Sequence, residues 1–141
     1  MIKNLSNNSY HLLRDSKNLS IEFFKYLSKF KPDVLIILGD RFEILSCAIS
    51  AFLSRVKIAH IHGGEVTSGS MDDTFRHCIS KLSNIHFVSH PSYKKRLIQL
   101  GEDPKKIFTF GGLGAENIKK SKFLPKKKIE EKFKFKFGNY K

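Results

Sequence analysis

Acidic, imidazole and guanidinium side chains are concentrated between residues 40 and 77 of this 141-residue chain. Carboxylates and imidazoles can exchange protons with a bound substrate when a partly dry cleft adjusts their acidity. Their spacing divides them into three groups, two at the ends of short apolar runs and one along the segment that follows. The candidate residues are Asp40, Arg41, His60, His62, Glu65, Asp72, Asp73, Arg76 and His77.

The last of these groups has the spacing of a helix face. Asp72 and Arg76 are four residues apart, as are Asp73 and His77, so each pair shares a face. Both carboxylates fall in the first turn, where the helix dipole stabilises negative charge. Asp73 therefore has two interpretations that stay open, a contact with substrate or a cap of the helix start. The apolar residues of the opposite, core-facing side are Phe75, Ile79 and Leu82.

The loop after the second apolar run contains His62, Gly63, Gly64 and Glu65. The glycines either only turn the chain or let the backbone approach a ligand closely. His60 and His62 form an H-x-H pair that could hold a metal, but a metal site needs three or four ligands within reach. No further set of ligands is visible in the sequence, so we expect neither a metal nor a cofactor.

Other polar residues have a plainer structural explanation. Gly39 and Asp40 could form only a strand-to-helix turn with an N-cap. His86 lies inside an apolar run, which is typical of a hydrogen-bonded core histidine. Cys47 and Cys78 lack any CxxC or Cys-His spacing, and we expect both to be small buried residues.

Strands that alternate with helices must position these groups. Short apolar runs predict strands, and apolar residues at helical spacing predict the helices between them. The expected strands are 34–38, 58–61, 85–88 and 107–110, and the expected helices are 20–30, 41–55, 72–83 and 91–100. This alternation predicts right-handed crossovers and a Rossmann-like parallel α/β sheet. Ligands of such sheets bind at the carboxyl ends of the strands, where the first two groups lie.

The formal net charge of +13 is concentrated at the C-terminus. Residues 119–141 hold ten of the 26 Lys and Arg residues and only two acidic ones. Phe133, Phe135 and Phe137 alternate with lysines there and could stack on nucleic-acid bases. We expect instead a solvated tail, with no nucleic-acid or membrane partner, because the excess charge lies outside the folded pattern. No apolar run has the length of a membrane helix or a signal peptide, and the default location is cytoplasmic.

Six blocks of residues resemble the hydrolysing UDP-N-acetylglucosamine 2-epimerases of sialic-acid biosynthesis. The blocks follow the family order between about residues 28 and 118, and as a set they are highly specific. They are KPDV at 31–34, GDRFE at 39–43, AHIHGGEVT at 59–67, MDDTFRH at 71–77, KLS at 81–83 and LGEDP at 100–104.

The resemblance implies a fold of the glycosyltransferase-B type, with substrate bound between two Rossmann-like halves. It also implies a reaction in which UDP leaves UDP-N-acetylglucosamine by elimination across C1–C2. Water then adds with inverted C2 stereochemistry and releases N-acetylmannosamine. One base must remove the C2 proton, while other groups stabilise charge and return a proton. The implied partner is a UDP-linked amino sugar, and a homo-oligomer is implied for the full-length family.

The resemblance also implies roles for single residues. Asp40 matches the acidic residue of the family's glycine-aspartate turn, and Asp72 and Arg76 match an acidic residue and an arginine of the next helix. His62 stands where some members have a third carboxylate, so either His62 or Glu65 performs that proton transfer. The implied catalytic set is Asp40, His62, Glu65 and Asp72, and the implied substrate-binding set is Arg41, His60, Gly63, Gly64, Asp73, Arg76 and His77.

The chain is shorter than the two domains that the resemblance implies. We expect a poorly patterned segment at 1–17, a partial sugar-side domain at 18–118 and a Lys-rich linker at 119–141 towards a missing nucleotide-binding domain. That domain would supply most nucleotide contacts, so we expect a truncated fragment, an incomplete N-terminal half with little or no activity alone. Two alternatives stay open, an epimerase of another UDP- or GDP-linked diacetamido sugar and a non-catalytic remnant or partner-binding half-domain.

Overall fold

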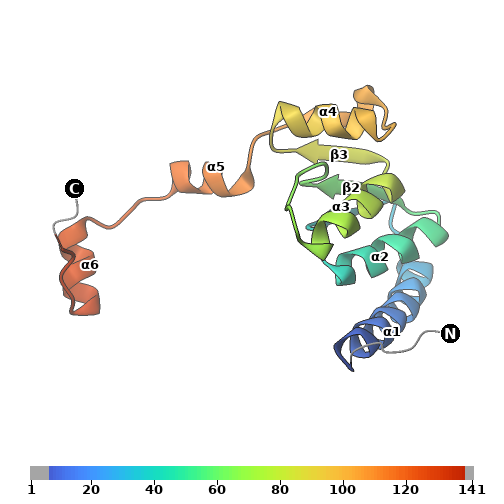
Figure 1. Cartoon of the computed structure of the whole chain (residues 1–141), viewed down its shortest axis with the longest axis horizontal. Coiled ribbons are helices and arrows are strands. Elements are labelled where there is room, and N and C mark those ends of the chain that lie inside the picture. The colour runs from blue at the N-terminus through green and yellow to red at the C-terminus, as the bar shows by residue number, and fades with distance from the viewer. Residues whose placement is uncertain (1–6, 139–141) are drawn as a thin grey trace.

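Four parallel strands in chain order, β1-β2-β3-β4, form one sheet with helices packed on it (Figure 1). The computed structural model describes residues 7–138. The helices are α1 (Asn7–Phe30), α2 (Phe42–Leu53), α3 (Met71–Leu82), α4 (Pro91–Gln99), the short 3-10 helix η1 (Pro104–Lys106), α5 (Leu113–Lys120) and α6 (Lys126–Phe133). The strands are β1 (Val34–Leu38), β2 (Lys57–Ile61), β3 (Ile85–Val88) and β4 (Ile107–Thr109).

The strand register divides the sheet into two faces. Leu35 of β1 lies beside Ile58 of β2, and Ile37 lies beside His60. His60 in turn pairs with His86 of β3. These side chains share the face covered by the connecting helices α2, α3 and α4, because right-handed crossovers between strands in sequential order all fall on one side of a sheet.

Two apolar clusters fill the space between this face and the helices. The larger cluster joins α1, α2 and α3 to β1 and β2, and it consists of Leu27, Ile37, Ala48, Ala51, Ile58 and Ile79. The smaller cluster places Leu97 of α4 against Val88 and Ile107. Full burial of a Leu or Ile side chain stabilises a fold by roughly 1.5–3 kcal/mol, so these clusters hold the strand ends at fixed positions.

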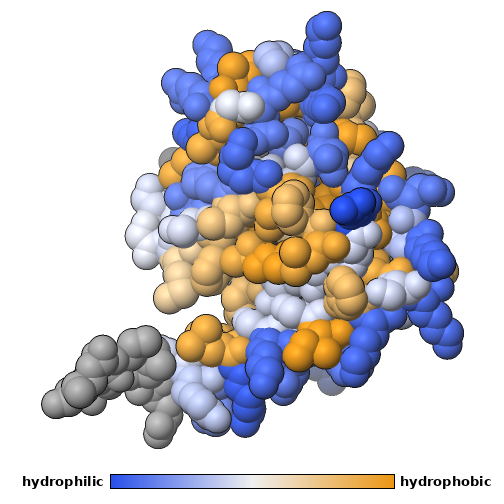
Figure 2. Space-filling view, turned by 90° about the vertical axis from the view of Figure 1, so that its right-hand side faces the viewer, coloured by the Kyte–Doolittle hydropathy of each residue, from blue (hydrophilic) through white to orange (hydrophobic). Residues whose placement is uncertain are grey.

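The opposite face of the sheet is largely exposed within the described residues. Ile36 in the middle of β1 is 67% exposed, and Phe110, just after β4, is 69% exposed. The rings of Phe87, Phe108 and Phe110 lie against one another across β3 and β4. Figure 2 shows how apolar side chains gather in the middle of one side of the molecule, with hydrophilic side chains around them.

Helix α1 begins at Asn7, well before the helix expected from residue 20. Its first turns occupy most of the poorly patterned segment 1–17, whose structure the sequence leaves open; residues 1–6 lie outside the described part. Most side chains of these turns are exposed or half-buried, so they lack the apolar periodicity that marks a buried helix. Farther along, Phe23 and Leu27 hold α1 in the core.

The four strands and the helices α2, α3 and α4 lie close to their predicted positions, and the parallel α/β sheet is confirmed, whereas η1, α5 and α6 are not among the predicted elements. The prediction that both cysteines are buried is wrong for Cys78, which is exposed on α3, while Cys47 is half-buried. The Lys-rich segment includes α6, none of whose residues is buried. Among residues 7–138, no helix combines the length and apolarity that a membrane crossing requires.

Candidate functional site

Arg76 joins the carboxyl end of β1 to the start of α3. Its side chain is only 8% exposed, and its Nη2 donates hydrogen bonds to Asp40 and to Thr67 Oγ1, the latter at 3.0 Å. Its Nη1 lies 3.5 Å from Asp73 Oδ1. Burial lowers the pKa of the Arg76 guanidinium. The carboxylates of Asp40 and Asp73 compensate its positive charge, and we call this three-residue cluster the brace.

The Asp73 carboxylate contacts both the loop before α3 and the Arg76 side chain. Its Oδ1 accepts a hydrogen bond of 2.7 Å from the Thr67 backbone N–H, and its Oδ2 lies 3.7 Å from His77 Nε2. These contacts engage the Asp73 carboxylate within the protein at the start of α3, while the N-cap residue of that helix is Ser70. His77 is half-buried and lines a groove between α2 and α3 rather than the pocket at the strand ends, and its contact with Asp73 links it to the other substrate-binding candidates.

Asp72 does not form the helix-face pair with Arg76 that its spacing suggests. Its backbone N–H donates the N-cap hydrogen bond to Ser70 Oγ at 3.2 Å. Its half-buried carboxylate makes no hydrogen bond or ion pair within residues 7–138, because Arg76 turns towards Asp40 instead. The Asp72 carboxylate is therefore available to a ligand.

His62 ends β2 in a left-handed backbone conformation, with φ of 67°. Its ring Nδ1 lies 2.6 Å from Glu65 Oε1. Ser89 Oγ, which follows β3, donates a hydrogen bond of 2.5 Å to the same oxygen. Each of the His62 and Glu65 side chains is 26% exposed, so this group combines solvent access with internal hydrogen bonds.

His60 lies behind this group and is fully buried. Its Nε2 donates to the Gly39 carbonyl at 3.1 Å, so its Nδ1 accepts from Ser80 Oγ at 3.2 Å. Burial lowers the pKa of His60 to about 4, and the ring is neutral at pH 7. The prediction that His60 contacts the substrate is wrong, because both of its ring nitrogens are hydrogen-bonded to the protein. His60 instead connects β1, β2 and α3.

The glycines of the loop are required by close packing within the protein. A Cβ on Gly63 would lie 3.0 Å from both His60 Nδ1 and Ser80 Oγ. A Cβ on Gly64, which has φ of 73°, would lie 2.7 Å from the Tyr93 carbonyl oxygen of α4. These distances support the interpretation that the glycines turn the chain, since the backbone here approaches the fold itself.

Arg41 points away from Asp40 and the brace. Its guanidinium pairs with Glu43, with Nη2 to Oε1 at 3.1 Å, and its side chain is 69% exposed. The predicted contact of Arg41 with substrate therefore has no preformed partner in the cluster.

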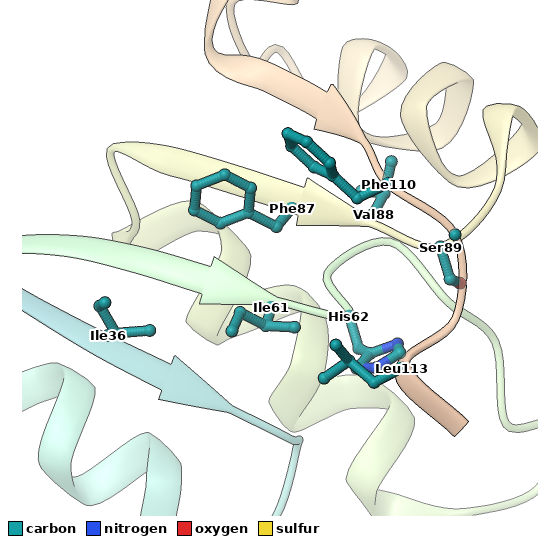
Figure 3. Close-up of a pocket in the computed structure, with 9 residues that line it drawn as sticks. Ile36, Ile61, His62, Phe87, Val88, Ser89, Phe110 and Leu113 are labelled. Carbon is teal, nitrogen blue, oxygen red and sulfur yellow. The ribbon is translucent and has the colours of Figure 1, made fainter. Parts of the chain in front are cut away.

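A pocket of about 410 Å³ opens on the exposed face of the sheet beside His62. Figure 3 shows the His62 ring at the end of β2 beside Leu113, with Ser89 at the end of β3. The remaining labelled residues are apolar: Ile36, Ile61, Phe87, Val88 and Phe110. Of the predicted site residues, only His62 lines this pocket. Ser89 is missing from the prediction, although its place after a strand is the same signal that identifies Asp40 and His62.

His86 is a core histidine, as its apolar surroundings predict. It is 1% exposed, and its Nε2 lies 3.2 Å from Glu102 Oε2, with Lys81 Nζ bound to the other carboxylate oxygen at 2.5 Å. Burial lowers the pKa of His86. Between residues 7 and 138, no three His, Cys, Asp or Glu side chains are grouped as metal ligands would be.

Comparison with known proteins identifies a family that the chain resembles. Residues 3–140 match the family model of UDP-N-acetylglucosamine 2-epimerase. The chain is 48% identical over 118 residues to a GDP/UDP-N,N'-diacetylbacillosamine 2-epimerase (hydrolyzing) of Campylobacter jejuni, which covers 82% of the chain and 31% of that relative. It is 41% identical over 123 residues to polysialic acid biosynthesis protein P7 of Escherichia coli, covering 87% of the chain and 32% of the relative.

A UDP-N-acetylglucosamine 2-epimerase of Neisseria meningitidis is 38% identical over 122 residues, covering 86% of the chain and 32% of the relative. The crystal structure of UDP-GlcNAc 2-epimerase from Neisseria meningitidis bound to UDP-GlcNAc has the same fold, with a TM-score of 0.72 and 23% identity. That match covers 95% of this chain and 37% of the other. The chain thus spans about a third of the length of the relatives that it matches.

Proposed function

The chain belongs to the UDP-N-acetylglucosamine 2-epimerase family, and on that premise we propose that its strand ends carry part of the sugar-processing site of a hydrolysing nucleotide-sugar 2-epimerase. The observation that carries the proposal is the gathering of acid–base groups at the carboxyl ends of adjacent parallel strands. Asp40 follows β1, His62 and Glu65 follow β2, and Ser89 follows β3. Ligands of parallel α/β sheets bind at this edge.

The substrate that we propose is a nucleotide-linked 2,4-diacetamido sugar. The sequence alone favours UDP-N-acetylglucosamine, with the diacetamido sugar as the alternative, and the comparisons support the alternative better. Identity is 48% to the relative named for N,N'-diacetylbacillosamine and 38% to the relative named for UDP-N-acetylglucosamine. Both alignments cover a similar share of this chain, so the difference in identity is a like-for-like argument.

The proposed reaction is elimination of the nucleotide across C1–C2, followed by addition of water. The elimination needs a base that removes the C2 proton and surrounding groups that stabilise the developing charge. The addition of water needs a group that returns a proton. Asp72 has a free carboxylate for such a transfer, whereas the carboxylate of Asp40 is engaged in the contact with Arg76. We therefore assign Asp40 to electrostatic support and keep Asp72 together with the His62–Glu65 pair for proton transfer.

The substrate proposal is tested in a full-length chimera. In it, the 118 matched residues of this chain replace the corresponding segment of the Campylobacter jejuni relative. Nucleotide release is measured with UDP- and GDP-linked N,N'-diacetylbacillosamine, with UDP-N-acetylglucosamine, and with UDP-glucose as the control that lacks an acetamido group. We expect kcat/KM to be highest for a diacetamido substrate and release from UDP-glucose to be absent. A preference for UDP-N-acetylglucosamine would overturn the substrate proposal.

The 141-residue chain alone is the second sample in this assay. It spans about a third of the relatives' length, and we expect it to release little or no nucleotide from any of these substrates. Steady turnover by the chain alone would show that this segment contains a whole active site.

A further inference from the structure

We infer that Glu65 and Ser89 are positioning residues that hold the ring proton of His62 on Nδ1, so that Nε2 is the proton-transfer atom of the site. The inference deepens the proposed function and rests on it for the identity of the substrate. It also decides between His62 and Glu65, which the sequence leaves open.

One carboxylate oxygen carries both contacts that support this assignment. Glu65 Oε1 lies 2.6 Å from His62 Nδ1 and 2.5 Å from Ser89 Oγ. The Ser89 hydroxyl donates to it, and an ionised carboxylate only accepts hydrogen bonds. Nδ1 must therefore carry a proton and donate it. In a neutral ring this leaves Nε2 without a proton, with its lone pair free.

We call the three hydrogen-bonded residues His62, Glu65 and Ser89 the relay, and the surrounding backbone holds them in place. The left-handed φ of His62 is a conformation that non-glycine residues rarely adopt, and it is held by the His62 N–H donating to the Phe87 carbonyl at 2.9 Å. The Gly64 carbonyl accepts a hydrogen bond from Arg96 of α4, so the turn that carries Glu65 is tied to the next helix. Ser89 directly follows β3, in the short connection to α4. The relay therefore joins two strand ends and does not depend on one mobile loop.

Nε2 faces open space within the described structure. It makes no hydrogen bond in residues 7–138, and the ring lines the 410 Å³ pocket with 26% of the side chain exposed. Figure 3 shows the ring at the end of β2, where it borders the apolar floor of the pocket. A substrate on the strand ends can reach Nε2 without displacing the hydrogen bond at Nδ1.

In the first stage of the reaction, Nε2 of His62 is the base. The lone pair of Nε2 takes the C2 proton, and the C2–H bonding pair becomes the second bond between C1 and C2. The C1–O bond breaks, and the nucleotide leaves with that pair. The imidazolium that results is stabilised by Glu65, whose Oε1 accepts the hydrogen bonds of His62 Nδ1 and Ser89 Oγ.

The test reads the tautomer directly and uses the complete 141-residue chain. The ¹⁵N shifts of the histidine rings are recorded at a pH where His62 is neutral, and His62→Gln identifies its signals. We expect a protonated Nδ1 and an unprotonated Nε2. In Glu65→Ala the ring should revert to the Nε2–H form that free histidine prefers. In Ser89→Ala the Nδ1–H share should fall, and Ser89→Thr, which keeps a hydroxyl, should restore it.

Each outcome decides the inference. An Nε2–H ring in the parent chain, or a ring that does not respond to Glu65→Ala, would overturn it, and an unchanged ring in Ser89→Ala would remove Ser89 from the relay. Backbone ¹H–¹⁵N spectra check that every variant keeps the fold. No substrate is present in this measurement, so a wrong substrate proposal leaves its result intact, and a wrong tautomer leaves the substrate preference of the chimera untouched.

Discussion

At the scale of single residues, the polar groups at the strand ends include buried ones that bind other parts of the protein. His60 and Arg76 are both buried, and both join the end of β1 to α3. His60 binds the Gly39 carbonyl, while Arg76 binds the next residue, Asp40. The position of Asp40 at the rim therefore depends on two neighbours from distant parts of the sequence, and each dependence can be measured.

The neutral His60 ring makes stability depend on pH. Burial holds its folded-state pKa at about 4, below the ordinary 6.5, so the unfolded chain binds the proton first as pH falls. Above pH 6.5 the neutral His60 ring makes its full contribution to the free energy of unfolding. As the pH falls from about 6.5 to 4, the free energy of unfolding decreases by up to about 3 kcal/mol. Urea denaturation at several pH values measures this. His60→Gln should remove most of the slope, and the lowered pKa of His86 should account for the remainder.

The Arg76 brace should matter more than an exposed ion pair. Arg76→Ala leaves Asp40 and Asp73 without their shared cation, and we expect a loss of about 3 kcal/mol in the free energy of unfolding. Arg41→Ala is the matched control, since the Arg41–Glu43 pair is exposed and should contribute less than about 1 kcal/mol. Equal effects of the two substitutions in urea denaturation would contradict the brace.

Sequence spacing identifies most of these residues but not which of them meet. Asp72 and Asp73 both lie about one helical turn from Arg76, yet Arg76 pairs with Asp73 and with Asp40, 36 positions away, rather than with Asp72. His60 and His62 look equivalent as an H-x-H pair, and only burial against α3 and the left-handed turn at His62 separate them. Which of these side chains pair depends on tertiary packing, and local sequence spacing carries no information about that packing.

At the scale of elements, the sheet is predictable because its strands are short, mainly apolar runs between segments with helical spacing. All three connecting helices are predicted as well, since each buries one apolar stripe. The start of α1 is not predictable in this way, because its first turns bury little. The loop between β2 and α3 shows the clearest dependence of the site on the packing of an element, through the contact of Gly64 with α4.

Replacement of Gly64 by alanine should separate that loop from α4. The new Cβ would lie 2.7 Å from the Tyr93 carbonyl oxygen and 2.9 Å from Leu97 Cγ, at a residue with positive φ. We expect a destabilisation of about 2–4 kcal/mol from strain and overpacking together.

Gly69→Ala is the control for backbone strain alone. Gly69 also has a positive φ, of 81°, but no atom lies within 4 Å of its added Cβ, so the expected cost is about 1–2 kcal/mol. Thermal or urea denaturation compares the two variants. A Gly64→Ala variant as stable as Gly69→Ala would contradict the packing role of this turn.

At the scale of the whole molecule, strand order determines which surface stays uncovered. Sequential parallel strands place α2, α3 and α4 on one face, and the other face exposes Ile36, Phe108 and Phe110 within the described residues. Exposed apolar surface of this kind promotes association. The relatives are about three times as long as the aligned region, so the isolated chain is the relevant sample for this property.

We expect the isolated chain to self-associate through this face. The double substitution Ile36→Lys and Phe110→Lys should shift it towards the monomer, as measured by sedimentation velocity at several concentrations. Val66→Lys is the control, because Val66 is 46% exposed but lies in the loop after β2. A parent chain that stays monomeric at high concentration would contradict this expectation.

The family assignment and the strand-end site together predict that the C2 proton of the sugar is exchanged. The direct measurement is turnover of UDP-linked N,N'-diacetylbacillosamine by the chimera in deuterium oxide, with the released sugar examined by NMR. Elimination and hydration predict deuterium at C2 in essentially every released molecule, and His62→Gln should abolish the release. Nucleotide release that leaves protium at C2 would mean simple hydrolysis and would contradict the account.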